Sequence, residues 1–310
     1  MENKRIVVAL GRNAFGKLFP DQQKAVKQAA IAIADLVEEK YQVVITHSNA
    51  PQVGMIHTAM TEFSRLEEEQ TVAPMSICSA MSQGYIGYDL QNAIRTELLD
   101  RGIYKTVTTL ITQVRVDPFD EAFTHPTKVI GRYMSEEEAK VEEQKGNYVV
   151  KDGDKGYRRI IASPKPIEIY EIDAIEALLN ANQVVIACGG GGIPVLQQGT
   201  KLKGASAVIE KDLTSAKLAD QLDANALLLL TGVEKVALNF GTASEQALDT
   251  MTQDEAKRYM EDGQFTSGSM LPKVEAAANF VASAPNRKAI ITSLDKAKAG
   301  IQGKTGTLFL

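Results

Sequence analysis

Short apolar runs recur along this chain, and each is typical of a strand buried on both faces of a sheet. They cover residues 6–10, 43–46, 107–112, 184–188, 226–231, 289–292 and 307–310. Between them, apolar residues return at helical spacing, as at Ala25, Ala29 and Ile33. Strands separated by such long amphipathic helices predict an α/β fold with a mostly parallel sheet covered by helices.

The pattern also predicts the bounds of individual elements. We expect helices over residues 21–39, 51–69, 85–99, 171–181, 210–222, 252–262 and 268–284. Residues 233–240 are predicted to return as a hairpin partner of the strand at 226–231. The final runs are expected to complete the sheet.

Residues 114–165 differ from the rest because charge rises and prolines appear. Glu136-Glu137-Glu138 opens a short polar helix, and residues 152–156 form a hairpin turn before a strand at 157–161. The alternative is a disordered insert, but the apolar content of the segment disfavours it. We predict one domain over 1–310, with 114–165 inserted as a small protruding subdomain.

Composition narrows the function classes. The 310 residues are 44% hydrophobic and 24% charged, with a net charge of −5, which argues against nucleic acid or an anionic membrane as the main partner. Two cysteines and three histidines provide neither a disulfide framework nor a zinc constellation. No apolar run reaches the roughly 18 residues of a membrane span, and no signal-peptide pattern is present, so we expect a cytoplasmic protein.

Four consecutive glycines, Gly189 to Gly192, follow one of the buried strands. Such a run indicates either backbone N–H groups that hold an anion or a tight turn into a helix, although one glycine suffices for a turn. Small-residue loops follow other strands at 11–14, 47–54 and 231–232. Because ligands of open α/β sheets bind at the carboxyl ends of the strands, these loops are predicted to converge on one crevice.

Three lysines lie in turns rather than on helix faces: Lys128, Lys211 and Lys273. Any single lysine is more often a solvated surface charge. Lysines together with glycine loops, however, are what phosphoryl transfer requires, since charge spreads over the phosphoryl oxygens. His47 is a candidate base, but transfer to an anionic oxygen needs little base catalysis, which favours a structural role. Gly303-Lys304-Thr305 lacks the earlier glycine and the helix of a nucleotide-binding P-loop.

Several motifs resemble those of the carbamate kinases in the amino acid kinase family. They are Val8-Ala9-Leu10-Gly11-x-Asn13-Ala14, Thr46-His47-x-Asn49-x-Pro51-Gln52-Val53-Gly54, Ser82-Gln83-Gly84-Tyr85, Pro126-Thr127-Lys128, Ser163-Pro164-Lys165-Pro166, Cys188 through Pro194, Lys211-Asp212, and Gly268-Ser269-Met270-x-Pro272-Lys273. They cover the whole chain in the family's order.

The resemblance implies a three-layer α/β/α sandwich around a mostly parallel eight-stranded sheet, with 114–165 as a subdomain that closes over the site. It also implies a homodimer that transfers a phosphoryl group between ATP and carbamate with Mg²⁺, usually forming ATP from carbamoyl phosphate and ADP in fermentative or nitrogen-catabolic metabolism.

By the same resemblance, phosphates would be contacted by Lys128, Lys211 and Lys273, with Glu210 beside them. The carbamate and the transferred group would be held by Gly11, Arg12, Asn13, His47, Ser48, Asn49, Ala50 and Gln52. The nucleotide would be bound by Gly189, Gly190, Gly191, Gly192, Asp212, Thr231, Val236 and Met270.

The chain departs from the family at the reaction centre. Arg12, Ser48 and Ala50 replace glycines of the family pattern, and Glu210 replaces an aspartate. If those three positions adopt positive φ, each side chain costs on the order of 1 kcal/mol. Glu210 could shift Lys211 if it orients that amine. Arg12 could fill the carbamate pocket or contact the transferred phosphoryl group.

These departures lead to the hypothesis that nucleotide binding is kept while the chemistry is altered or reduced. Two other functions therefore stay open at this point. One is a kinase acting on a different carbamate or carboxylate, and the other is a nucleotide-binding paralogue that serves as a partner or regulator.

Overall fold

The computed structural model describes residues 4–16, 19–66 and 72–310. Its central sheet has eight strands in the order β15-β17-β16-β12-β1-β2-β9-β3. The pairs are parallel except β16 with β17, which is antiparallel. The strands are β1 (Arg5–Leu10), β2 (Gln42–His47), β3 (Val107–Thr109), β9 (Val184–Ile186), β12 (Ala226–Thr231), β15 (Thr250–Met251), β16 (Lys288–Ser293) and β17 (Thr307–Phe309).

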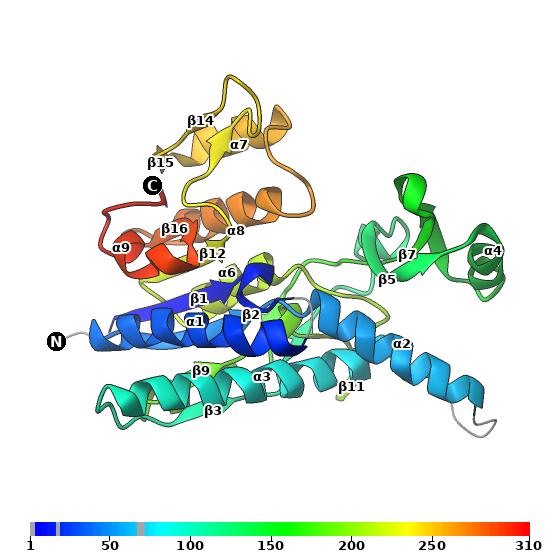
Figure 1. Ribbon diagram of the computed structural model, residues 1–310, viewed down its shortest axis with the longest axis horizontal. Helices are drawn as coiled ribbons and strands as arrows, with labels where there is room; N and C mark the ends of the chain where they lie inside the picture. The colour runs from blue at the N-terminus through cyan, green and yellow to red at the C-terminus, as the bar shows by residue number, and fades with distance from the viewer. Residues whose placement is uncertain (1–3, 17–18, 67–71) are drawn as a thin grey trace.

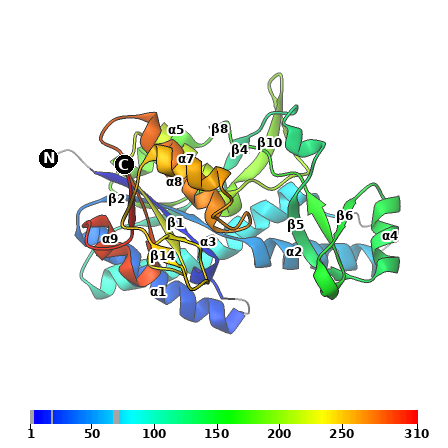
Figure 2. The same cartoon turned by 90° about the horizontal axis from the view of Figure 1, so that it is seen from above.

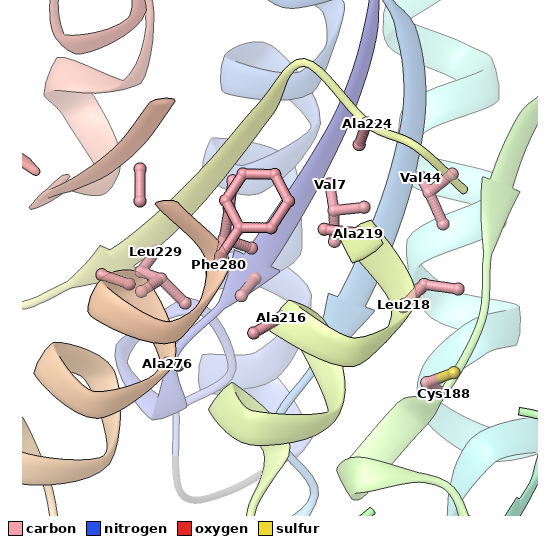
Figure 3. Close-up of a cluster of buried hydrophobic side chains, with 14 of the residues drawn as sticks. Val7, Val44, Cys188, Ala216, Leu218, Ala219, Ala224, Leu229, Ala276 and Phe280 are labelled. Atoms are coloured by element: carbon pink, nitrogen blue, oxygen red, sulfur yellow. The ribbon is translucent and has the colours of Figure 1, made fainter. Parts of the chain in front are cut away.

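Helices cover both faces of this sheet, and β1, β2 and β12 at its centre are therefore buried at nearly every position. One core joins Ile6, Val8 and Leu10 of β1 to α1 (Phe19–Glu38), α3 (Met75–Asp100) and α9 (Ala297–Ile301). The other joins Val7 and Ala9 to α5 (Ile172–Asn180), α6 (Lys211–Gln221), α7 (Gln253–Glu261) and α8 (Met270–Ser283). Figure 3 shows the second core beneath α6 and α8. The three-layer α/β/α prediction is confirmed.

A second sheet departs from the predicted pattern. Its order is β11-β10-β4-β8, with β4 (Gln113–Arg115), β8 (Glu168–Ile169), β10 (Ile193–Gln198) and β11 (Lys201–Gly204). The single strand predicted over 107–112 is therefore wrong, since β3 ends at Thr109 and β4 begins in the other sheet. A strand, not a helix, follows the four glycines.

The predicted hairpin at 233–240 is also wrong. β13 (Ala237–Leu238) pairs with β14 (Gln246–Ala247) rather than with β12. The reason is that β12 already has a parallel neighbour on each side, β1 and β16, so neither of its edges is free.

Two helix predictions need adjustment. α3 begins ten residues before the predicted 85–99 helix, where polar residues interrupt the apolar pattern. α2 (Ala50–Leu66) begins at the predicted place, but the expected extension over residues 67–69 lies outside the described residues. The described helices include none that is long and apolar enough to cross a membrane.

The segment after β4 builds a small three-stranded sheet, β5-β7-β6, beside α2 (Figures 1 and 2). It comprises β5 (Lys128–Met134), β6 (Tyr148–Lys151), β7 (Tyr157–Ile161) and α4 (Glu136–Gln144). A capping box between Ser135 and Glu138 begins α4, so the helix predicted there is confirmed. The division into one domain with an inserted subdomain at 114–165 stays a prediction.

Candidate active site

The four small-residue loops lie together at one edge of the central sheet. In the register, Leu10 stands between His47 on one side and Leu230 on the other. Gly11 N–H donates to the Leu230 carbonyl (3.1 Å) and Ser48 N–H donates to the Leu10 carbonyl (3.1 Å). The loops after β1, β2 and β12 thus form one surface, built by backbone pairing.

The glycine run packs against this surface so closely that no side chain fits. An added Cβ at Gly189 would lie 2.3 Å from Nε2 of His47, and one at Gly190 would lie 2.0 Å from Nδ2 of Asn49. An added Cβ at Gly191 would lie 2.3 Å from the Ile209 carbonyl oxygen, and one at Gly192 would lie 2.2 Å from Cγ2 of Val114. Gly190 to Gly192 all have positive φ. Neither sequence interpretation of the run anticipated this contact with the 47–49 loop.

A second close approach joins the first loop to β12. An added Cβ at Gly232 would lie 2.1 Å from Nδ2 of Asn13. Asn13 belongs to a short 3₁₀ turn, η1 (Arg12–Ala14), directly after Gly11. Thr231, a predicted nucleotide contact, ends β12 beside this glycine and is half-buried.

A buried charge cluster lies at the start of α6. Asp212 accepts from Nζ of Lys211 (2.5 Å) and from Nζ of Lys273 (2.9 Å), and all three side chains are at most 10% exposed. Burial by itself would raise the pKa of Asp212, but the two ammonium groups outweigh it and hold that pKa below its usual value. Burial lowers the pKa of Lys211, with Lys273 adding to the effect and Asp212 opposing it. The sequence-predicted pair Lys211 and Lys273 is thus brought together around one carboxylate.

Lys128 reaches the same region from the protruding sheet. Its ammonium group forms an ion pair with Glu210, which stands at the N-terminus of α6. Lys211 pairs with Asp212 instead, so Glu210 does not orient the Lys211 amine. Glu210 therefore connects the small sheet to the start of α6.

His47 is buried, and its Nδ1 lies 3.2 Å from the Ser48 carbonyl. Since a carbonyl can only accept, Nδ1 carries the proton and Nε2 is left as an acceptor. Burial is the main reason that the pKa of His47 falls to about 4; the Ser48 carbonyl opposes this shift, and the nearby Lys211 charge adds to it. A neutral, packed imidazole agrees with the structural role that the sequence favoured.

The three positions that replace family glycines have ordinary backbone conformations. Arg12 begins η1, Ala50 begins α2, and neither these nor Ser48 takes a positive φ. The strain considered for them is therefore absent. Arg12 is exposed, and its guanidinium group has no hydrogen-bond or ion-pair partner among the described residues.

Other predicted site residues form hydrogen bonds within the fold or begin a helix. Gln52 is buried and donates to Gln22 (3.0 Å), and Asn49 donates to Ser82 (2.8 Å). Val236 is fully buried, with its N–H donating to Thr307 (2.9 Å), while Met270 begins α8. The described part of the chain contains no group of three or more His, Cys, Asp and Glu side chains that could hold a metal ion.

Sequence reasoning missed the side chains that hold these loops from below. Gln83 donates to the carbonyls of Thr112 (3.2 Å) and Gly189 (3.1 Å), and Thr214 donates to the Gly191 carbonyl (2.9 Å). The available signal was the polar pair Ser82-Gln83 on a helix that continues with buried Ile86 and Leu90.

A hollow of about 200 Å³ lies elsewhere. It is lined by α6 and α8 residues such as Leu213, Lys217 and Asn279, together with Lys165 and Pro166. None of the four loops lines it, so the site is defined by the convergence of loops and charges rather than by this hollow.

Comparison with known proteins identifies the family. The model of the amino acid kinase family matches residues 4–293. The chain is 54% identical over 306 residues to the carbamate kinase-like protein YqeA of Escherichia coli (strain K12), with 99% of each chain covered. It is 47% identical over 309 residues to carbamate kinase of Clostridium perfringens (strain 13 / Type A), with 98% of each covered.

A solved structure agrees with these relatives. Carbamate kinase from Giardia lamblia bound to AMP-PNP matches with a TM-score of 0.92 at 35% identity, covering 100% of this chain and 99% of that one. The protein described here therefore belongs to the amino acid kinase family, and its resemblance to the carbamate kinases is confirmed.

Proposed function

We propose that this protein is a carbamate kinase-type phosphotransferase that moves a phosphoryl group reversibly between ATP and carbamate. The observation that carries the proposal is the buried Lys211–Asp212–Lys273 cluster beside the converged glycine loops. Charge spread over a transferring phosphoryl group needs fixed cations in a place that excludes water. The relatives named carbamate kinase, at 47% identity and nearly full coverage, support carbamate as the acceptor.

Within this proposal, the residues divide into two sides. Lys128, Lys211 and Lys273 contact phosphates, while Gly11, Asn13 and the 47–52 loop hold the carbamate and the transferred group. Thr231, Val236 and Met270 belong to the segments beside the nucleotide. Because Gly189 and Gly190 pack directly on His47 and Asn49, we place the glycine run at the boundary between the two sides.

Mg²⁺ fits the proposal as a companion of the nucleotide. The carboxylate next to the lysines is Asp212, and both its oxygens already accept from ammonium groups. Mg²⁺ commonly keeps several waters and binds through substrate phosphates, so it needs no dedicated protein cage here. When bound, it would supply neutralisation of phosphate charge.

A homodimer is also part of the proposal. Ile77, Met81 and Tyr88 are exposed on α3 at spacings of four and seven, which places them on one face of the helix. Gly84 lies between them, with no heavy atom within 4 Å of an added Cβ. We propose that a second copy of the chain covers this face of α3. The proposed compartment is the cytoplasm, where the free cysteines Cys78 and Cys188 stay reduced. Sedimentation of the wild type and of Met81→Lys tests the dimer, which the charge should weaken.

The decisive assay is ATP formation from carbamoyl phosphate, ADP and Mg²⁺. We expect turnover by the wild type and a loss of at least about 100-fold in Lys273→Met, because one fixed cation is removed. Lys298→Met is the matched control, since Lys298 pairs with Glu39 on the surface. AMP-PNP binding without any turnover would contradict the proposal and would identify a nucleotide-binding paralogue.

A further inference from the structure

Two adjacent polar residues lie on the buried side of α3, directly below the glycine run. Ser82 and Gln83 are at most 1% exposed. Burying a hydroxyl or an amide is unfavourable unless its hydrogen-bonding groups find partners. The hydrogen-bond partners of these two side chains therefore indicate their roles.

The Gln83 amide pairs with backbone as a neighbouring strand would. Its Oε1 accepts from Thr112 N–H (2.9 Å), and its Nε2 donates to the Thr112 carbonyl (3.2 Å) and the Gly189 carbonyl (3.1 Å). Only a carboxamide supplies these two donors and one acceptor, and the distance from α3 to Thr112 and Gly189 requires the length of the Gln side chain.

Thr112 passes this restraint to both ends of the glycine run. Its Oγ1 accepts from Cys188 N–H (3.0 Å), just before the run, and its carbonyl accepts from Ile193 N–H (2.9 Å), just after it. Cys188 has a positive φ of 53°, so the chain turns sharply at that point. The run is thus held at Cys188, at Gly189 and at Ile193 by one buried pair, Gln83 and Thr112.

The preceding residue, Ser82, holds the opposite loop. Its hydroxyl accepts from Nδ2 of Asn49 (2.8 Å), and Asn49 is the side chain against which Gly190 packs. On the other side, Thr214 of α6 donates to the Gly191 carbonyl (2.9 Å), less than one turn after Lys211 and Asp212. Consecutive residues of α3 therefore set the positions of two site loops relative to the charge cluster.

We propose that Gln83 is a positioning residue, which acts through the glycine run to align the 47–49 loop with the Lys211–Asp212–Lys273 cluster. The inference rests on the proposed phosphotransferase function. Four glycines carry no side chains with which to anchor themselves, and glycine is the most flexible residue, so an external anchor is needed. A displacement of about 1 Å in such a site can reduce the rate by about 100-fold.

The test compares Gln83→Met with Gln91→Met. Both residues lie on α3, and Gln91 likewise accepts from a backbone N–H, that of Thr109 (3.1 Å), but it does not touch the glycine run. We expect Gln83→Met to lower kcat for ATP formation by about 10–100-fold. Its KM for ADP should change less than about threefold, whereas Gln91→Met should stay within about twofold of the wild-type kcat. A kcat for Gln83→Met within twofold of Gln91→Met would overturn the proposal.

Gln83→Glu provides a readout that a merely structural role would not move. The introduced carboxyl group keeps the acceptor for Thr112 N–H, and when protonated it can also donate to the Gly189 carbonyl. We therefore expect its kcat, relative to the wild type, to rise as the pH falls. A ratio that is independent of pH would count against positioning by a donated hydrogen bond.

Hydrogen exchange separates this inference from the proposed function. Gly191 and Gly192 N–H groups are bonded to the Cys188 and Gly189 carbonyls, so their exchange reports the order of the run. We expect exchange over 187–194 to be at least about tenfold faster in Gln83→Met than in Gln91→Met, even if the wild type forms no ATP. Equal exchange in the two variants would refute the anchoring role, whereas absent turnover by the wild type would refute only the proposed reaction.

Discussion

The glycine run at 189–192 and the positions 12, 48 and 50 belong to the same site but follow opposite rules. In the run, an added Cβ would meet another atom at 2.0–2.3 Å at every position, and three of the four have positive φ. At Arg12, Ser48 and Ala50, the backbone is ordinary, and Arg12 and Ala50 are exposed. Glycine is thus required where two loops touch and dispensable where a loop faces outward.

This difference changes how the departures from the family pattern are understood. The sequence alone suggested that side chains at 12, 48 and 50 strain the reaction centre. The structure shows no backbone strain at positions 12, 48 and 50. Any effect of Arg12, Ser48 and Ala50 on the reaction must therefore come from what their side chains contact. Arg12, an exposed cation next to Asn13, is the one that adds charge to the site.

The largest expected effect is that of Gly190→Ala. The added methyl group combines positive φ with a 2.0 Å approach to Asn49, so we expect a loss of about 3 kcal/mol or more in the free energy of unfolding. Gly199→Ala is the control, because Gly199 has φ +61° but nothing within 4 Å of an added Cβ. It should lose only about 1 kcal/mol. Urea unfolding of both variants measures the difference, and equal losses would break the comparison.

The next effect depends on pH and concerns His47, which packs on Gly189. Its pKa of about 4 in the folded protein lies below its ordinary value of 6.5, so the unfolded chain binds the proton first as the pH falls. This stabilisation is full above pH 6.5 and decreases toward pH 4, by up to about 3 kcal/mol. Between pH 7.5 and pH 4.5, the free energy of unfolding should decrease less in His47→Gln than in the wild type. A decrease of the same size would mean that His47 is not buried neutral.

A smaller effect is expected at the fourth substituted position. Glu210→Gln removes the charge that holds Lys128, and since both side chains are partly exposed the loss in stability should be about 1 kcal/mol or less. The rate of ATP formation should nevertheless fall, because Lys128 loses the contact that brings it to α6. Glu136→Gln, which breaks the exposed pair with Lys140, is the matched control and should leave activity unchanged. Unchanged activity in Glu210→Gln as well would show that this ion pair does not position Lys128.

The smallest effect is expected for Arg12→Gly, which restores the family pattern. Because Arg12 is exposed with ordinary φ, the cost should be about 0.5 kcal/mol from backbone entropy. A gain in stability would instead reveal strain at this position. The kcat for ATP formation then measures what the guanidinium group contributes to the reaction.

Much of the site could be predicted from the sequence, because motifs and strand ends are local signals. The convergence of the 11–14, 47–54, 189–194 and 231–232 loops followed from their places after buried strands. Lys211 and Lys273 were selected because they were predicted to lie in turns. That placement is wrong, since they lie in the first turns of α6 and α8, but they do share a buried carboxylate. The roles assigned to individual substrate and nucleotide residues stay predictions until ligands are bound.

Other features depended on contacts between residues far apart in the chain. Gln83 and Thr112 are 29 positions apart, and Lys128 and Glu210 are 82 apart, so no local pattern reveals either pair. The predicted hairpin at 233–240 failed for a similar reason, since both edges of β12 were occupied by strands distant in sequence.

The sequence by itself determined a mostly parallel sheet covered by helices and the kind of chemistry, because apolar runs, helical spacing and loop composition are properties of neighbouring residues. Only the tertiary structure decided why four glycines stand in a row, since their contacts come from the 47–49 loop and α3. It also decided which acid pairs with which lysine. Steric exclusion and ion pairing act across space, and the fold sets those distances.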